Sequence, residues 1–389
     1  MNELNIFCFL SNLFVAILCG VLMPMIPGLT RKSFLFGVKI PSKEQNAPKV
    51  KAMKKRYTIV CVIGSVTILA LSIVQFHAAP DLSLIAMMYI PFLLIAVYLA
   101  AFVPNWKRAL ILKEKCGWQV SSSVFAETNS SHSRGNLSEL PWGWYIVGLM
   151  IVVVTAVIVL VCYPALPNKI PIHFDIKMNA DSWSDKSVGV VLLLPILNLF
   201  MLFFMWLTGV LTVKAKLQVD AENPALSFAQ HHIYRRRFGH YLGLETLSIV
   251  VLFAILGFAT LWQEFRVPFW LILCLIIVPA VPLCVFSVRA GQGGCKLNPK
   301  NVIPKGSTLT VQTGVVPCDD DKHWLIGMFY HNPKDPACVV EDRFGNGIGF
   351  NYARFSVKIG VAISLMVLVA GYTWITAWAA TNLLMNEVR

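Results

Sequence analysis

A loop at residues 164–186 holds the side chains best suited to bind a metal. His173 and Asp175 are two positions apart, so an extended backbone places an imidazole and a carboxylate on the same side. With Asp181 and Asp185 they form a candidate metal site. The alternative is that these side chains cap and hydrogen-bond a folded loop. We adopt that second interpretation and assign no metal ligand.

Three other motifs also have both a chemical and a structural interpretation. The three aspartates at residues 319–321 are a candidate site for a divalent cation, but we expect a solvated turn. Residues 231–237, His-His-Ile-Tyr-Arg-Arg-Arg, are expected to anchor the chain at a membrane surface rather than to form a site. The glycines at 345, 347 and 349 lack the Lys-Ser or Lys-Thr that follows a phosphate-binding loop.

The sequence also lacks several signatures of catalysis and cofactor binding. It has no HExxH or GxSxG motif, no paired intramembrane aspartates, and no CxxC pair among its ten cysteines. We therefore expect neither enzyme activity nor a cofactor. The net charge of +13 is typical of basic cytoplasmic loops in a membrane protein, and no nucleic-acid-binding motif is present.

The sequence contains apolar runs long enough to form helices that cross a bilayer, and these helices would position the motifs above. Hydrophobic residues make up 57% of the 389-residue chain and charged residues only 14%, whereas a soluble domain has about 25% charged residues. A helix needs about 20 apolar residues to span the hydrocarbon core. We predict spans at 5–29, 57–78, 82–103, 143–163, 187–213, 241–262, 267–288 and 356–384. The predicted fold is an all-α polytopic membrane bundle of about eight helices, with a small β-rich cytoplasmic insert before the last helix.

The distribution of basic residues predicts the orientation of these spans. Segments 30–56, 104–142, 214–240 and 289–355 hold most of the 33 Lys and Arg residues, and they alternate with segments that hold few. Because basic loops stay in the cytoplasm, both termini are predicted to lie outside. We expect a multi-pass protein of a bacterial plasma membrane, whose basic loops contact anionic headgroups.

The predicted outer loop, 164–186, is more than a passive connector. Pro164, Pro167 and Pro171 are expected to hold its first half extended. Apolar residues alternate from Ile170 to Phe174, which predicts a short strand. We expect the loop to form an ordered cap.

This loop resembles that of SdpI-like membrane proteins, a group whose members carry a domain of unknown function. The shared pattern is L-P-x-x-I-P-x-H-F/W, a turn, and D-x-W/Y-x-x-K, although Met178 and Asn179 replace the usual glycine of the turn. The resemblance implies immunity to, or sensing of, a secreted peptide outside the cell, and a regulatory protein as partner inside. The residues expected to contact the peptide are Pro167, Ile170, Pro171, His173, Phe174, Asp175, Asp181, Trp183 and Lys186.

The segment 289–355 carries a second signature. Its pattern, D-D-x-x-W-x-x-G-x-F-Y-x-N-P-x-D-P followed by R-F-G-x-G, resembles another uncharacterised domain found near the C-terminus of such proteins. The turn-forming pairs Asn-Pro and Asp-Pro predict a small β-rich unit. The motif residues are Asp320, Trp324, Tyr330, Asn332, Pro333, Asp335, Pro336, Arg343, Phe344 and Gly345.

These features divide the chain into five regions and leave three functions open. The regions are 1–142 with three spans, 143–213 with the SdpI-like hairpin, 214–288, the cytoplasmic segment 289–355, and the last span at 356–389. Peptide sensing or immunity is the first hypothesis. A permease for a small or lipidic solute is the second, and a membrane enzyme is the third.

Overall fold

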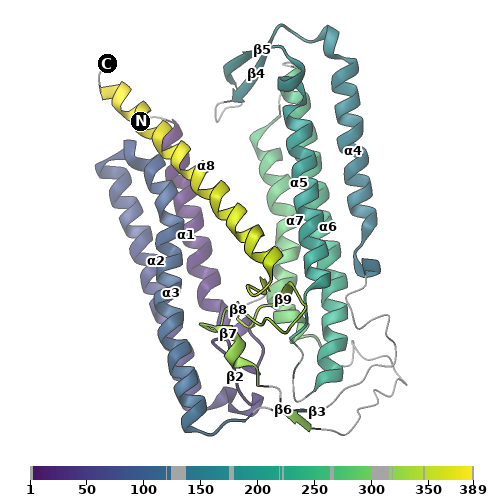
Figure 1. Ribbon diagram of the computed structural model, residues 1–389. Helices are drawn as coiled ribbons and strands as arrows, with labels where there is room; N and C mark the ends of the chain where they lie inside the picture. The colour runs from purple at the N-terminus through teal and green to yellow at the C-terminus, as the bar shows by residue number, and fades with distance from the viewer. Residues whose placement is uncertain are drawn as a thin grey trace. The chain divides into compact units, whose positions relative to one another are not determined.

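The computed structural model describes eight long helices and several small pairs of strands between them (Figure 1). The described residues are 3–119, 121–123, 137–174, 179–218, 220, 223–262, 267–298, 315–317, 319–344 and 347–387. The helices are α1 (Glu3–Leu29), α2 (Pro48–Ala78), α3 (Ser83–Lys115), α4 (Trp142–Val161), α5 (Val188–Lys214), α6 (Pro224–Leu261), α7 (Phe269–Ala290) and α8 (Phe355–Glu387).

All eight helices are long and apolar enough to cross a membrane, which agrees with the predicted number for a multi-pass protein. Three of them extend well beyond the predicted spans. Helix α2 starts at Pro48 instead of 57, α3 continues to Lys115 instead of 103, and α6 starts at Pro224 instead of 241. The added turns are rich in Lys and Arg, which favour helix although they end an apolar run.

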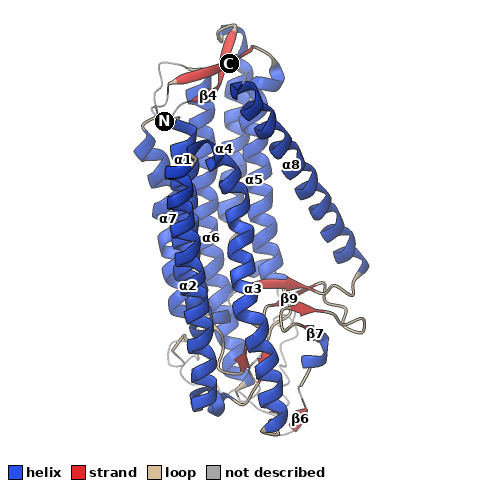
Figure 2. Ribbon diagram, turned by 90° about the vertical axis from the view of Figure 1, so that its left-hand side faces the viewer, coloured by secondary structure: helices blue, strands red, loops and turns tan. Residues whose placement is uncertain are grey.

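The strands are short and form antiparallel pairs, so little of the chain is sheet (Figure 2). The pairs are β1 (Phe34–Leu35) with β2 (Val38–Lys39), β3 (Ser121–Ser123) with β6 (Val315–Pro317), β4 (Lys169–Phe174) with β5 (Ala180–Asp185), β7 (Trp324–Leu325) with β8 (Phe329–Tyr330), and β9 (Val339–Glu341) with β10 (Ile348–Phe350). A parallel bridge joins Lys216 to Val340, so the α5–α6 connection adds to the β9–β10 pair. The predicted β-rich character of the 289–355 segment is confirmed for its described part.

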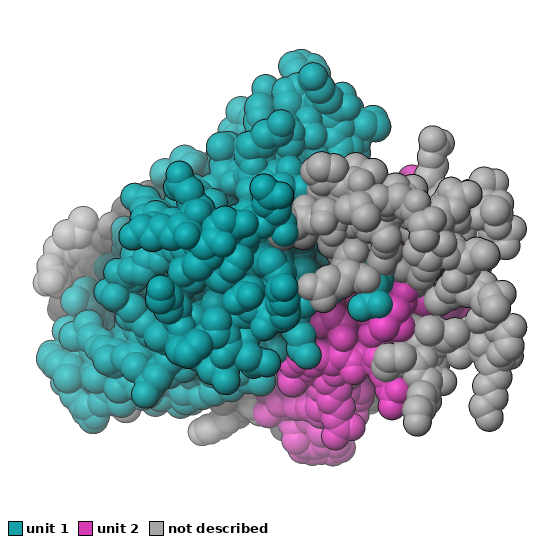
Figure 3. Space-filling model, turned by 90° about the horizontal axis from the view of Figure 1, so that it is seen from below, with its two compact units in different colours: residues 1–126, 216–225, 308–389 teal, residues 127–215, 226–307 magenta. Residues whose placement is uncertain are grey.

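The chain folds into two compact units, which Figure 3 colours separately. Unit 1 contains residues 1–126, 216–225 and 308–389, and unit 2 contains residues 127–215 and 226–307. Each unit is therefore built from segments that are far apart in the sequence.

Unit 1 is centred on helices α1, α2 and α3. The buried residues of α2 recur every three or four positions, from Tyr57 through Cys61, Ser65 and Ile68 to Ser72, so they form one face. Apolar side chains such as Ile63 lie on the other faces and are exposed. This pattern is expected of a helix whose remaining faces contact lipid. The β1–β2 hairpin packs Leu35, Phe36, Val38 and Ile40 into the same core, beside α2 and α3.

Unit 2 contains α4 to α7. A buried cluster joins α4, α5 and α6 through Val152, Leu202 and Val250. Within it, the Asn198 side chain donates a hydrogen bond to the Val250 carbonyl oxygen at 3.0 Å. A second cluster lies where α4 and α5 are joined by the β4–β5 hairpin.

Candidate functional site

The β4–β5 hairpin is attached to unit 2 through the first half of β4. Ile170 is 2% exposed and packs with Val159, Leu166, Val191 and Leu261, which belong to the surrounding helices and loop. Pro171, its neighbour in β4, is also buried. Ile170 and Pro171 therefore anchor the hairpin, although the sequence placed both among the peptide-contacting residues.

Lys186 also stabilises the loop. Its Nζ donates to the carbonyl oxygen of Leu166 at 2.8 Å, and the ammonium lies 5.3 Å from the centre of the Tyr163 ring. Its backbone N–H donates to the Asn168 carbonyl oxygen at 2.8 Å. These contacts join the two ends of the loop. Pro164 lies in a 3-10 turn, Tyr163–Ala165, so the predicted extended path is wrong at this proline.

Other side chains of the loop and hairpin are exposed. Ile172 is 51% exposed and Trp183 is 44% exposed, and His173 and Pro167 are exposed as well. Phe174 is half-buried. Asp175 lies outside the described residues, and Asp181 lies in β5 with its side chain not described. The His173–Asp175 pairing therefore stays a prediction.

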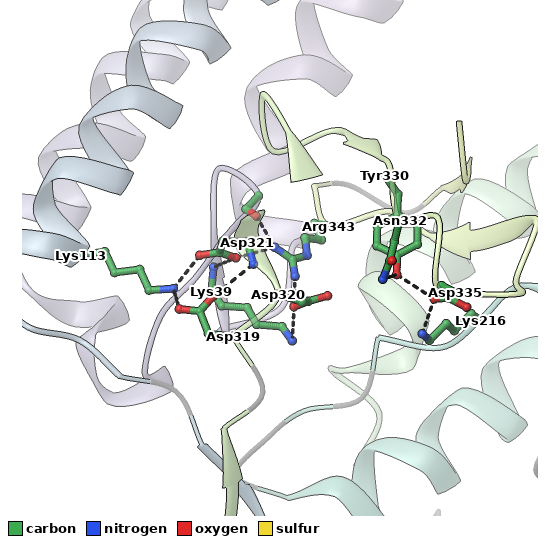
Figure 4. A network of polar contacts seen from close by, with 11 residues as sticks. Lys39, Lys113, Lys216, Asp319, Asp320, Asp321, Tyr330, Asn332, Asp335 and Arg343 are labelled. Carbon is green, nitrogen blue, oxygen red and sulfur yellow. Dashed lines mark hydrogen bonds and ion pairs between the residues drawn. The ribbon is translucent and has the colours of Figure 1, made fainter. Parts of the chain in front are cut away.

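A buried arginine organises the 319–344 segment of unit 1 (Figure 4). The Arg343 side chain is fully buried. Its guanidinium donates to Asp321 Oδ1 at 2.5 Å, to the Gly37 carbonyl oxygen at 3.2 Å, and to Asp320. Its Cζ lies 4.6 Å from the centre of the Trp324 ring. A planar guanidinium suits such forked and stacked contacts. We call Arg343, Lys39, Lys113 and the aspartates at 319–321 the Arg343 network.

Two lysines complete the network. Lys39 Nζ lies 2.7 Å from Asp320 Oδ1, and Lys113 Nζ lies 2.5 Å from Asp319 Oδ2 and 2.6 Å from Asp321 Oδ2. Burial alone would raise the pKa of the Asp320 carboxyl, but the charges of Arg343 and Lys39 outweigh it and lower the pKa. The aspartates keep contact with solvent, as the predicted turn would, but these carboxylates are also paired with cations drawn from distant parts of the chain.

A second group of polar contacts surrounds Asp335. The carboxylate accepts hydrogen bonds from Tyr330 Oη at 2.7 Å and Lys216 Nζ at 2.5 Å. Asn332 Nδ2 donates to Tyr330 Oη at 3.1 Å. Burial and the Asp335 hydrogen bond raise the pKa of the Tyr330 hydroxyl to about 12. Asn351 is fully buried and donates to three backbone carbonyl oxygens, those of Asn332, Asp335 and Ala337.

The α5–α6 connection joins the same unit through Glu341. The Glu341 carboxylate lies 3.4 Å from the Arg31 guanidinium and accepts from the Gln218 backbone N–H at 2.9 Å. Arg31 also donates to the Gln218 carbonyl oxygen at 2.5 Å. Together with the Lys216–Val340 bridge, these contacts hold residues 216–218 against the first loop and against β9.

The comparisons with known proteins cover part of this architecture. A family model matches residues 150–199. It is DUF1648, a domain of unknown function. The DUF1648 segment contains the second half of α4, the β4–β5 hairpin and the first part of α5. The match is consistent with an SdpI-like membrane protein. No curated protein and no solved structure matches the chain.

The predicted motif residues lie in several different environments. Pro167, His173 and Trp183 are exposed in the DUF1648 segment, whereas Ile170, Pro171 and Lys186 stabilise its hairpin. In the other motif, Asp320, Trp324, Tyr330, Asn332, Asp335 and Arg343 take part in the polar contacts described above. Phe344 packs among aromatic rings, with the ring centres of Phe102 and Phe36 4.8 and 5.4 Å away. Pro333 and Pro336 are exposed, and Gly345 lies outside the described residues.

The lysines and the asparagine that complete these contacts were missed. From the sequence, three lysines, Lys39, Lys113 and Lys216, are recognised only as positive charges of predicted cytoplasmic loops. No role is assigned to Asn351. The three aspartates were an available signal, since a dense acidic run in a basic chain needs cations near it. Their partners could not be chosen, because Lys39 lies in β2, Lys113 in α3 and Arg343 after β9, far apart in the sequence.

The described residues provide no group of three or more His, Cys, Asp or Glu side chains arranged to hold a metal ion. The Arg343 network is instead a set of carboxylates neutralised by cations. Its chemistry is suited to fixing chain segments in one arrangement rather than to transferring protons.

Proposed function

We propose that this protein is a membrane receptor that binds an extracytoplasmic peptide on its β4–β5 hairpin. The observation that supports the proposal best is the mixed exposure of this hairpin. Ile170 is buried and anchors it, whereas the large apolar side chains of Ile172 and Trp183 are exposed. An isolated pair of strands has two edges with open backbone groups, and an extended peptide can pair with such an edge. The SdpI-like resemblance, which implies peptide immunity, supports the same ligand class.

Helix α5 provides a route from this hairpin to unit 1. The helix begins directly after β5, where the Ser187 side chain accepts a hydrogen bond from the Val190 N–H at 3.3 Å. It has 27 residues, which corresponds to about 40 Å. Lys216, two residues beyond its end, pairs with Val340 and contacts Asp335. A change at the hairpin would therefore be transmitted along one continuous helix to the β9–β10 pair.

The proposed orientation places the hairpin outside a bacterial plasma membrane and the 289–355 segment inside. The inner side would then meet anionic headgroups and a regulatory protein. Immunity and signalling would be two outcomes of the same binding event. Capture of the peptide would give immunity, and its effect on the inner regulatory protein would give the signal. The proposal needs no cofactor and no catalytic step.

Survival of a deletion strain tests the proposal. The strain is complemented with wild type, Trp183→Ala or Ser182→Ala, and exposed to a panel of membrane-active peptides and to spent culture medium. Ser182 is the matched control, because it is exposed on the same strand. We expect wild type and Ser182→Ala to restore resistance to at least one peptide and Trp183→Ala to lose it. Equal survival of the deletion and complemented strains across the panel would contradict the proposal.

A permease is the second candidate, because unit 1 has polar groups inside its helices. Asn12, Ser65 and Ser83 are buried, and each has a side-chain polar atom without a hydrogen-bond partner among the described residues. Polar groups inside a membrane often mark a solute path. Uptake of labelled amino acids and lipids into proteoliposomes tests this function. Transport that Asn12→Leu abolishes and that Trp183→Ala leaves intact would favour the permease over the receptor.

A further inference from the structure

The β7–β8 hairpin of unit 1 has an apolar tip and a polar base. Its tip consists of Leu325, Ile326, Gly327, Met328 and Phe329. The base carries Lys322 and His323 before the hairpin and His331 after it, and the backbone N–H of His331 donates to the His323 carbonyl oxygen at 2.8 Å. Leu325 is 56% exposed and Phe329 is 42% exposed. In a water-soluble hairpin such a tip would be unfavourable.

The tip points along α3 toward its apolar part. The residues before the hairpin contact the basic end of α3, where Lys113 pairs with Asp319 and Asp321. At the tip, the Met328 sulfur lies 3.6 Å from Tyr98 Oη, within the apolar run 82–103. Tyr98 and Lys113 are about 22 Å apart along a helix with a rise of 1.5 Å per residue. The Met328 side chain therefore reaches the level at which α3 is apolar, and the Gly327 backbone lies beside Trp106, just beyond the end of that apolar run.

Close packing seats the turn against α3 and the first loop. Gly327 has a φ of +71°, and a Cβ at this position would lie 2.8 Å from the Phe36 carbonyl oxygen and 2.8 Å from a ring carbon of Trp106. Only glycine allows this approach. One side of the turn is thus fixed to protein, and the exposed side chains of Leu325 and Phe329 are on the remaining surface.

The exposed surface continues onto α8. The rings of Phe329 and Tyr352 are 5.6 Å apart, and the Tyr352 N–H donates to the Tyr330 carbonyl oxygen at 2.9 Å. Helix α8 begins three residues later at Phe355, which is 78% exposed. Hairpin and helix together present one apolar surface. Figures 1 and 2 both show β7 beside the lower half of α3, on the side from which α8 starts.

The backbone of the hairpin is suited to an apolar environment. Gly327 N–H donates to the Trp324 carbonyl oxygen at 3.2 Å, and Met328 N–H donates to the Leu325 carbonyl oxygen at 3.2 Å. Non-helical backbone at membrane depth requires such internal hydrogen bonds and protein on its other side. The Gly327 and Met328 N–H groups meet the first condition, and the packing of Gly327 against Phe36 and Trp106 meets the second at this turn.

We infer that the β7–β8 hairpin dips into one leaflet of the bilayer, with Leu325 and Phe329 in contact with lipid acyl chains beside the first turn of α8. The Arg343 network then lies at the polar base of the hairpin and holds it at this depth. A second copy of the chain is the other possible occupant of the apolar surface. The depth of Met328 on α3 and the continuity with a candidate spanning helix favour lipid. The inference is independent of peptide binding at the β4–β5 hairpin.

Photo-crosslinking tests this placement in the full chain. The variants Leu325→p-benzoylphenylalanine and Phe329→p-benzoylphenylalanine are each reconstituted in liposomes of phosphatidylethanolamine and phosphatidylglycerol, irradiated and analysed by mass spectrometry. Val367 on α8, which is 67% exposed, is the lipid-contacting reference. Lys334, exposed beyond the polar base of the hairpin, is the control.

We expect phospholipid adducts at positions 325 and 329 in yields comparable to that at 367. The control at 334 should give about tenfold less, because the probe reacts with acyl C–H bonds only where hydrocarbon surrounds it. Adducts at 329 no more abundant than at 334 would overturn the inference. A crosslinked dimer as the main product at 329 would overturn it as well, and would assign the surface to a second copy. Phe329→p-benzoylphenylalanine changes an exposed aromatic ring to a larger one, so the fold should be kept.

Discussion

Arg343 combines in one side chain the contacts that hold the network together. It is fully buried, is paired with two carboxylates, and lies between the rings of Phe34 and Trp324. Without Arg343 the two carboxylates keep Lys39 and Lys113 as partners, but each loses a hydrogen bond to a charged group, which contributes about 1.5–3 kcal/mol. Arginine suits this position for three reasons. It is positively charged, its guanidinium can donate to two carboxylates, and the planar group can stack on aromatic rings.

Replacing this side chain should destabilise the protein strongly. We predict that Arg343→Met lowers the free energy of unfolding by about 3–5 kcal/mol, measured as a lower melting temperature in detergent micelles. Arg343→Lys should show an intermediate loss, because an ammonium cannot donate in parallel to both aspartates. Lys334→Met, at an exposed position, should have little effect. Equal melting temperatures for the 343 and 334 variants would show that the network does not contribute to stability.

Asp342, the residue before Arg343, should make stability depend on pH in the opposite sense to the paired aspartates. Burial, and then the charge of Glu341, raise the pKa of Asp342 to about 7. An unfolded aspartate has a pKa of about 3.9, so between about pH 4 and 7 the folded state binds more protons than the unfolded state. The free energy of unfolding should therefore fall as pH rises through this range.

The comparison of wild type with Asp342→Asn isolates this effect. We predict that the melting temperature of wild type falls between pH 5 and about 8, and that the variant loses most of this dependence. Asp185→Asn, exposed in β5, should behave as wild type. The aspartates with lowered pKa values, such as Asp335, lose their stabilisation only at lower pH, as they become protonated. A pH profile unchanged by Asp342→Asn would contradict this assignment.

At the scale of the element, two hairpin turns pack directly against each other. Gly37 has a φ of +80°, and a Cβ at this position would lie only 2.1 Å from the Gly327 carbonyl oxygen. The β1–β2 and β7–β8 turns thus meet backbone to backbone. A side chain on either turn would force the two hairpins apart.

Gly37→Ala should therefore cost far more than its backbone strain. A left-handed backbone costs an L-residue about 1–2 kcal/mol. Gly117→Ala provides the matched control, because Gly117 has a φ of +60° and nothing within 4 Å of an added Cβ. We predict a modest fall in melting temperature for Gly117→Ala and a much larger one for Gly37→Ala, with faster proteolysis of the 319–344 segment. Equal losses would show that the two turns do not need to touch.

At the scale of the whole molecule, an even number of spans puts both termini on one side. With eight spans, the β4–β5 hairpin should share that side and Lys334 should lie on the other. We predict that Ser182→Cys reacts with an impermeant maleimide in intact cells, whereas Lys334→Cys reacts only after permeabilisation. The measurement uses a chain whose ten native cysteines are replaced by serine. Labelling of both positions in intact cells would refute the predicted topology.

The parts of the fold that could be predicted from sequence are those encoded locally. Apolar run length gave the eight helices, and the alternation from Ile170 to Phe174 gave β4. Helix ends were missed where Lys-rich turns continue α2, α3 and α6 beyond the apolar core. The Arg343 network could not be foreseen, because its members at positions 39, 113 and 320 are joined only by the tertiary fold. The exposure of single side chains also could not be predicted from the sequence. Ile170 and Ile172 are the same residue type, yet Ile170 is buried and Ile172 is exposed.

The composition of unit 1 has a consequence for biogenesis. Phe36 packs against Phe344, and Gly37 bonds to Arg343, yet about 300 residues separate these partners in the sequence. At about 5–20 residues per second, the ribosome needs roughly 15–60 s to synthesise that interval. During this time six further helices, α2 to α7, are synthesised, and the first hairpin lacks its contacts with Arg343 and Phe344. A chaperone or protease could bind this hairpin before residues 319–344 are synthesised. Folding of the first third of the chain therefore depends on completion of the last third.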